Sequence, residues 1–231
     1  YNYQNAEILD KAVYYLEKAG DYAKEMYQNT AALGFYEKLL VVVEKMENKP
    51  IKILLNVKLN IAELLLLNGQ PERTELILSE LVNTDIPYTE ISDRLQYVNA
   101  RSLVMKADYT KLKEFLIPII DDIKTELYRN HLELYYLDAL RFLNEDFIGE
   151  AAIFLKELRH NKNKEFEAKL LNVIGVYYLH KSQYMKAMKH FHLNYEIVDE
   201  LNDMNLVRMA LHNIGVVSFR MGDSDKAEEN Y

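Results

Sequence analysis

The chain has 231 residues, of which 28% are charged, and its formal net charge is -8 at pH 7. This acidic balance, with a pI near 5.4, argues against nucleic-acid binding, because contact with phosphates needs a basic stripe. The absence of cysteine excludes disulfides and thiolate chemistry and agrees with the cytoplasmic location that we expect. No apolar run is long enough to span a bilayer, so we expect no membrane partner.

Small residues recur about every forty positions, and each is followed at fixed distances by two further residues of similar type. The small residues are Gly20, Ala62, Ala100, Ala139, Gly175 and Gly215. Twelve positions later stand Ala32, Thr74, Leu112, Ala151, Ala187 and Ala227, and sixteen positions later Tyr36, Leu78, Leu116, Leu155, Phe191 and Tyr231. Self-similarity at such a period is typical of repeat architectures. Each frame predicts two antiparallel helices that meet at the small residues, with the large residue filling the next layer.

The first two frames follow this pattern closely. The first frame adds Leu16 on the same helix face as Gly20. The second has the sequence Asn-Ile-Ala ending at Ala62 and a turn predicted near Asn68–Gly69. Pro71 stands just after that turn, where a proline is well placed to open the second helix.

The third and fourth frames depart from the pattern. Gln96 and Tyr135 stand where the clearest frames have leucine, and Asn99 and Asp138 stand where those frames have an apolar residue. Either these residues are functional departures or the fourth register is shifted. We expect a helix break near Ala107–Asp108 in the third frame.

Pro118 should kink or end its helix, because it has no amide donor and crowds the preceding turn.

The last two frames are the clearest. The fifth has an inner stripe, a turn at 182–184 and a second helix, and the sixth has a turn near Gly222–Asp223. Their inward residues are Leu171, Ile174, Gly175, Tyr178, Ala187, Phe191 and Val198, then Leu211, Ile214, Gly215, Ala227 and Tyr231.

These last frames resemble the tetratricopeptide repeat: a large apolar residue, an apolar-glycine pair, an aromatic, an alanine and a second aromatic. The resemblance implies an all-α solenoid, a right-handed superhelix of about six helix-turn-helix repeats without a sheet. It covers residues 1–231 as a single array. The chain lacks an initiator Met and stops within a helix, so we expect a piece truncated at both ends. The long spacing is similar to extended repeats of bacterial signalling regulators, both Rap-type peptide sensors and arrays fused to ATPases or nucleotide cyclases.

In tetratricopeptide arrays the first helix of each repeat lines a concave groove. The resemblance therefore implies a groove for a protein or peptide segment, formed by Leu59, Asn60, Glu63, Leu66, Arg94, Tyr97, Arg101, Met105, Tyr136, Leu140, His180, His212, Asn213 and Arg220. Tyr97, Met105 and Tyr136 are the expected anchors, while Arg94 and Arg101 would orient an acidic partner. Alternatively, some of the leucines pack against neighbouring helices, depending on the curvature of the array.

The sequence offers no catalytic constellation. His190 and His192 are two positions apart and point to different sides of a helix, unlike a helical metal pair at i and i+4. The seven glycines are dispersed and form no phosphate-binding loop. Asp121 and Asp122 are most simply part of a solvated face. We therefore expect no enzymatic activity, no cofactor and no metal.

Three functions remain open. The first is a non-catalytic scaffold or sensor module of a multidomain signalling protein, with a protein or peptide in the groove. The second is a peptide-pheromone receptor domain of the Rap-like kind, which favours several groove asparagines in contact with peptide backbone. The third is a structural array that forms a homodimer through its own apolar surface and spaces other domains. The identity of the ligand and the oligomeric state do not follow from the sequence.

Overall fold

The computed structural model describes residues 2–84 and 86–222, and its side chains from residue 7 onward. Within these residues the chain is all-α, with eleven α-helices, one short 3₁₀ helix and no strand. The helices are α1 (Asn2–Glu25), α2 (Asn29–Glu44), α3 (Ile51–Leu67), α4 (Pro71–Val82), α5 (Thr89–Met105), α6 (Tyr109–Leu116), η1 (Ile120–Asp122), α7 (Glu126–Phe142), α8 (Ile148–His160), α9 (Lys164–His180), α10 (Tyr184–Glu200) and α11 (Met204–Arg220). The expected twelfth helix, with Ala227 and Tyr231, lies outside the described residues.

By its internal contacts the chain divides into two compact units, unit 1 (Tyr1–Leu132) and unit 2 (Glu133–Tyr231), with the boundary inside α7. Unit 1 holds α1 to α6 and the start of α7. Unit 2 holds the end of α7 and α8 to α11. The expectation of one continuous array over residues 1–231 stays a prediction.

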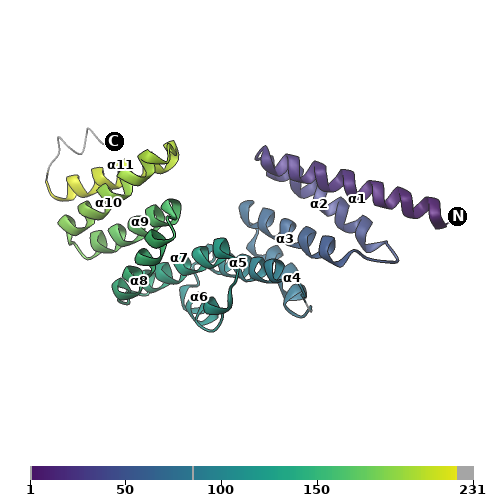
Figure 1. The fold of residues 1–231 in the computed structure, drawn as a ribbon, viewed down its shortest axis with the longest axis horizontal. Helices are drawn as coiled ribbons and strands as arrows, with labels where there is room; N and C mark the ends of the chain where they lie inside the picture. Colours follow the sequence, from purple (N-terminus) through teal and green to yellow (C-terminus); the bar gives the residue numbers. More distant parts are fainter. Residues whose placement is uncertain (1, 85, 223–231) are drawn as a thin grey trace. The chain divides into compact units, whose positions relative to one another are not determined.

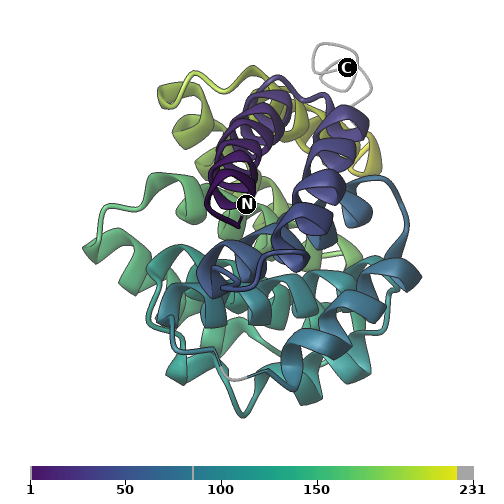
Figure 2. The same ribbon diagram turned by 90° about the vertical axis from the view of Figure 1, so that its right-hand side faces the viewer.

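In unit 1, helices that follow one another along the chain pack side by side. α1 lies against α2, α2 against α3, and α3 against both α4 and α5 (Figures 1 and 2). Apolar side chains from α1, α2 and α3 form one core cluster, in which Tyr36 and Leu39 are fully buried. A second cluster joins α3, α4 and α5 around Leu59 and Leu78. The apolar faces of α1 to α5 are therefore covered by helices that lie next to them in the sequence.

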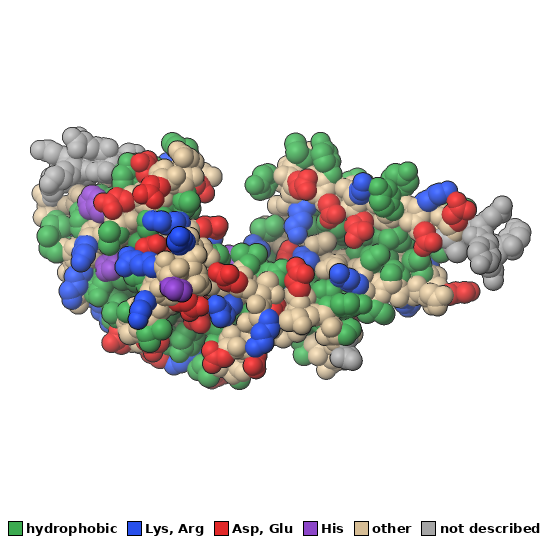
Figure 3. All heavy atoms as spheres, in the orientation of Figure 1, with side chains coloured by type: hydrophobic (Ala, Val, Ile, Leu, Met, Phe, Trp, Pro, Cys, Tyr) green, Lys and Arg blue, Asp and Glu red, His purple; other side chains and the backbone are tan. Residues whose placement is uncertain are grey.

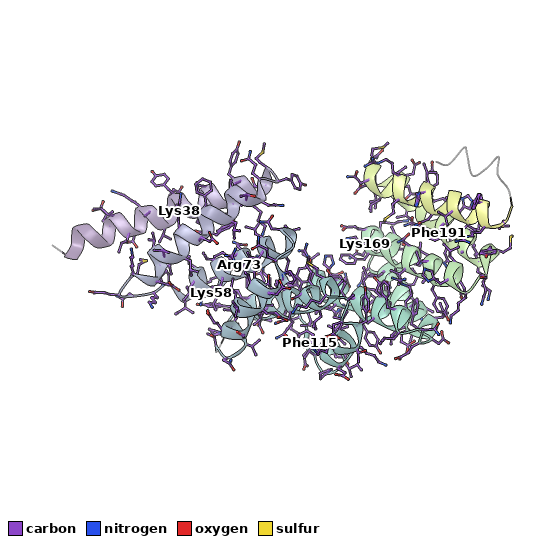
Figure 4. All side chains as sticks on the ribbon, turned by 180° about the vertical axis from the view of Figure 1, so that it is seen from behind. Lys38, Lys58, Arg73, Phe115, Lys169 and Phe191 are labelled. Atoms are coloured by element: carbon purple, nitrogen blue, oxygen red, sulfur yellow. The ribbon has the colours of Figure 1, made fainter. Side chains whose placement is uncertain are left out.

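Unit 2 is built in the same way. α9 packs against α8 and α10, and α10 packs against α11. Phe191 of α10, labelled in Figure 4, is fully buried between α9 and α11, in a cluster with Ala187 and Ile214. A buried amide also ties α10 to α9, because Asn194 Nδ2 donates to the Ala168 carbonyl at 2.8 Å.

Three of the recurring small residues, Gly20, Ala62 and Gly175, lie at close helix contacts, as the spacing predicted. A Cβ added to Gly20 would lie 2.8 Å from the Tyr36 ring, and one added to Gly175 would lie 2.5 Å from the Phe191 ring. Each ring stands sixteen positions after its glycine and rests directly on the glycine backbone. In the second frame, Thr74 Oγ1 donates to the Ala62 carbonyl at 3.3 Å, so the helices approach closely there too.

The turn between the two helices of a frame recurs at a fixed position. A residue with positive φ follows the small residue by seven positions in five frames: Tyr27, Gly69, Ala107, Ser182 and Gly222. In the fourth frame the corresponding residue is Asn144, only five positions after Ala139. The turn is then two residues longer, since α8 begins at Ile148. Counted back from its turn, the first helix of the fourth frame is thus shifted by two residues.

The predicted helix breaks are confirmed where the structure describes them. α3 ends at Leu67 and α4 begins at Pro71, and α5 ends at Met105, before Ala107–Asp108. α6 ends at Leu116, and Pro118 follows just beyond it. α11 ends before Gly222, whereas Asp223 lies outside the described residues.

Candidate functional site

Three leucines that we expected in the groove are buried instead. Leu59 and Leu66 are fully buried in the cluster of α3, α4 and α5, and Leu140 is 3% exposed in the core of unit 2. They pack against neighbouring helices and offer no surface to a ligand. For Leu140 the reason is the shifted fourth register: the equivalent position counted from Asn144 is Asp138, not Leu140.

Two of the charged residues expected in the groove of unit 1, Glu63 and Arg94, bind one another. Glu63 accepts from Arg94 Nε at 2.8 Å and from Lys24 Nζ at 3.0 Å. Asn60 Oδ1 accepts from Arg94 Nη2 at 2.6 Å and from Lys24 Nζ at 3.3 Å. We call Lys24, Asn60, Glu63 and Arg94 the Glu63 network. It links α1, α3 and α5, and its two acceptors each serve both cations.

The pKa values reflect this mutual pairing. Burial raises the pKa of Glu63, but the hydrogen bonds and charges of Arg94 and Lys24 outweigh it, so the pKa is lowered overall. For Arg94, burial lowers the pKa, yet the bond to Glu63 raises it above its ordinary value. Both groups therefore stay charged at neutral pH. Because its charge is already paired, Arg94 is a poor anchor for an acidic partner, contrary to our expectation.

A second polar contact in unit 1 was missed at the sequence level. The Tyr36 hydroxyl donates to Asp21 Oδ1 at 2.5 Å. Burial, and then this bond to Asp21, raise the pKa of Tyr36 well above its ordinary value. The signal was present in the sequence, since Asp21 directly follows the glycine on which the Tyr36 ring rests.

The remaining expected groove residues differ in exposure. Tyr97 is half-buried, stacks on Tyr128 with ring centroids 5.5 Å apart, and lies 5.1 Å from the His131 ring. Met105 is 45% exposed, and Arg101 is half-buried with no ion pair to another described residue. Tyr136 packs against the core of unit 2. Only Met105 and Arg101 thus remain available in α5, beside the partly covered Tyr97.

In unit 2 the structure brings two expected groove residues together. An open cavity of about 350 Å³ is lined by Leu179 and His180 of α9, by Ser182 and Tyr184 at the start of α10, and by Val216 and Arg220 of α11. We call it the Arg220 pocket. None of its four polar side chains has a hydrogen bond or ion pair to another described residue. No described carboxylate lines it.

The other polar residues expected in unit 2 lie outside this pocket. Asn213 Nδ2 donates to Asn172 Oδ1 at 2.7 Å and so links α11 to α9, while His212 is exposed. His190 is half-buried and stacks on Tyr178, whereas His192 is exposed, so the two do point to different sides. Burial, followed by the nearby Lys189 and Arg159 charges, lowers the pKa of His190.

Two further findings concern the residues that the structure describes. They contain no group of three or more histidine and acidic side chains that could hold a metal ion. None of the helices they form is both long and apolar enough to cross a membrane.

Comparison with known proteins shows the fold and no more. No protein-family model matches the chain, and no curated protein matches it significantly. Among solved structures, it is similar to BtubC (BKLC) from P. vanneervenii, with a TM-score of 0.62 and 14% identity over 96% of this chain and 87% of that chain. At this identity the likeness establishes a shared helical, repeat-like arrangement.

Proposed function

We propose that this chain is a non-catalytic module that binds an acidic segment of a partner protein through the Arg220 pocket. In this proposal it belongs to the tetratricopeptide superfamily and serves as a scaffold or sensor module of a cytoplasmic signalling protein. The glycine contacts of Gly20 and Gly175, and the turns seven positions after the small residues, support the superfamily assignment.

The observation that carries the proposal is the chemistry of the pocket lining. Arg220 provides a fork of N–H donors, and the Ser182 and Tyr184 hydroxyls and the His180 ring add further donors around one cavity. A guanidinium with adjacent donors matches the two oxygens of a carboxylate. Because these donors have no described partner within the chain, binding a carboxylate breaks no existing bond. The Glu63 network would have to lose bonds to do the same.

The test measures binding of a fluorescent glutamate-rich peptide and of its glutamine counterpart. We expect the glutamate peptide to bind more tightly. Arg220→Glu should weaken it about tenfold or more, the effect of losing one charge-assisted hydrogen bond. Equal binding of the two peptides, or an unchanged affinity in Arg220→Glu, would refute the proposal.

The matched control is Lys181→Glu. Lys181 follows His180 directly and is exposed, but it does not line the pocket, since its Nζ donates to Asn144 Oδ1 at 2.6 Å. Both variants change the net charge by the same amount. We expect Lys181→Glu to bind nearly as the wild type does, which separates a local contact from general electrostatic attraction.

One observation favours homodimerisation as a second candidate function. Ile8, Tyr15 and Tyr22 are exposed and lie along one side of α1, at spacings of seven residues, and the exposed Met26 directly follows the end of the helix. Such an apolar stripe is typical of an interface. On the face drawn in Figure 3, apolar side chains over α1 lie among charged ones. Analytical ultracentrifugation of the wild type and Tyr15→Glu tests this candidate, which predicts a dimer that the variant loses.

The Rap-like alternative has less support from the side-chain contacts. It favours groove asparagines that contact peptide backbone, whereas Asn60 and Asn213 both form hydrogen bonds within the chain.

A further inference from the structure

A second cavity lies wholly within unit 1, among α4, α5 and α6. It is open to solvent and measures about 440 Å³. Leu78 and Val82 of α4, Leu103 of α5 and Phe115 of α6 give it a mainly apolar wall. Of these residues, Phe115 is labelled in Figure 4. We call it the α4–α6 pocket. Its volume falls in the range of ordinary ligand pockets.

Two polar side chains of α5 line the same cavity. Ser102 is 3% exposed, and its hydroxyl has no hydrogen-bond partner among the residues that the structure describes. Asn99 donates from Nδ2 to the Leu95 carbonyl at 3.1 Å, which leaves Oδ1 without a bond to a described residue. A buried hydroxyl without a partner costs free energy, so it marks a site that a ligand would improve.

The sequence adds an independent observation. Asn99 stands directly before the small residue Ala100, where the first, second, fifth and sixth frames have alanine or isoleucine. The register of the third frame is sound, since its turn residue Ala107 has the standard spacing. The departure at Asn99 is therefore real, and it places an amide on the wall of an apolar cavity.

The charge of the pocket indicates what it can accept. Among the described residues that line it, Glu75 alone is charged, and it forms an ion pair with Lys106. An unpaired charge on the ligand would find no counter-charge there. The occupant should therefore be uncharged, with a large apolar part and one group that both donates and accepts hydrogen bonds. A peptide unit beside an apolar side chain has this composition.

We propose that the α4–α6 pocket receives an uncharged apolar side chain, of leucine or phenylalanine size, from a partner peptide. The backbone N–H beside that side chain donates to Asn99 Oδ1, and its carbonyl accepts from the Ser102 hydroxyl. Because the pocket is open, a free small molecule would remain largely in water, whereas a peptide also covers Val82, which lines the pocket and is exposed. The site is separate from the Arg220 pocket and does not depend on the function proposed for it.

The test titrates the ¹⁵N-labelled protein with the capped peptide acetyl-Gly-Ser-Phe-Ser-Gly-amide, followed by NMR. We expect saturable shifts of amides at 78–83, 99–103 and 115. The same peptide with serine in place of phenylalanine should not bind, and N-acetylphenylalaninamide should bind more weakly than the peptide. If the single amide binds as tightly as the peptide, the site takes a free small molecule and the proposal is wrong. Absence of saturable shifts in this region also overturns it.

Two variants at residues that line the pocket, with one control outside it, test the proposal. Ser79→Phe places a ring in the cavity from an exposed position on α4 and should reduce peptide affinity at least tenfold. Thr110→Phe, at an exposed position of α6 outside the pocket, should leave affinity unchanged. Ser102→Ala removes only an unpaired hydroxyl, so the fold should persist while affinity falls several-fold. Unchanged affinity in Ser79→Phe would place the peptide elsewhere.

Discussion

The Glu63 network of unit 1 and the Arg220 pocket of unit 2 each place an arginine among polar side chains. They differ in whether the chain itself supplies hydrogen-bond acceptors for that arginine. In the network, Glu63 and Asn60 occupy the donors of Lys24 and Arg94. In the pocket, Arg220 and its neighbouring donors have no described partner. Residue type and repeat position are thus insufficient to assign a binding role. A cation becomes available to a ligand only where the chain supplies no acceptor of its own.

The largest expected effect tests the packing that both units share. Gly175→Leu would force a side chain into the Phe191 ring and should lower the free energy of unfolding by about 3 kcal/mol. Ala187→Leu and, in unit 1, Gly20→Leu should act similarly. Lys186→Leu, at an exposed position of α10, is the control. Equal melting temperatures for Gly175→Leu and Lys186→Leu would show that the register of the repeats is wrong.

The second prediction sets the network directly against the pocket. Glu63→Ala leaves Arg94 and Lys24 partly buried without their carboxylate and should cost about 2 kcal/mol, less than for a fully buried pair because some solvent reaches the site. Arg220→Ala removes an exposed side chain that has no described partner and should change stability by less than about 0.5 kcal/mol. Urea unfolding measures both. Similar losses in the two variants would remove the distinction between the regions.

Acid should weaken the network selectively. The folded-state pKa of Glu63 is lowered, so the folded chain binds fewer protons than the unfolded chain once the pH falls to the ordinary glutamate value. The stability from Glu63 is then fully present above about pH 5 and is lost as the pH falls through the folded-state pKa. We expect the stability difference between wild type and Glu63→Gln to shrink below about pH 4.5. A constant difference down to pH 3 would contradict the pairing.

The smallest effect separates glycines that lie beneath a ring from those that do not. An added Cβ at Gly34 of α2 meets nothing within 4 Å, so Gly34→Ala should stabilise the chain by about 0.5 to 1 kcal/mol through helix propensity. Gly20→Ala should destabilise it, because its Cβ meets the Tyr36 ring. Thermal unfolding of the two variants gives the signs. The same sign in both would show that the ring contact does not require glycine.

Much of the fold could be predicted from the sequence, because the spacing of small and large residues reflects local helix packing. Gly20 and Tyr36 lie in adjacent helices of one hairpin, so a fixed offset reveals their contact. The fourth frame misled us because Ala139 and Ala151 keep the offset of twelve while the turn after Asn144 gains two residues. An asparagine with positive φ is difficult to recognise from the sequence alone.

The candidate site was less predictable. Leu59 and Leu66 are apolar, but their type does not tell whether a ligand or a neighbouring helix covers them. The bond between Arg94 and Glu63 joins residues 31 positions apart and depends on how α3 meets α5. The convergence of His180 and Arg220 on one cavity likewise requires the packing of α9 against α10 and of α10 against α11.

The most direct test of the difference between the two regions is an NMR titration of the ¹⁵N-labelled chain with the glutamate-rich peptide. We predict saturable shifts of amides at 179–184 and 216–220, with the amides of Asn60, Glu63 and Arg94 unchanged. The glutamine peptide should produce much smaller shifts at the same positions. Shifts centred on Asn60, Glu63 and Arg94 would contradict the account, because they would make the network, and not the Arg220 pocket, the surface that meets the partner.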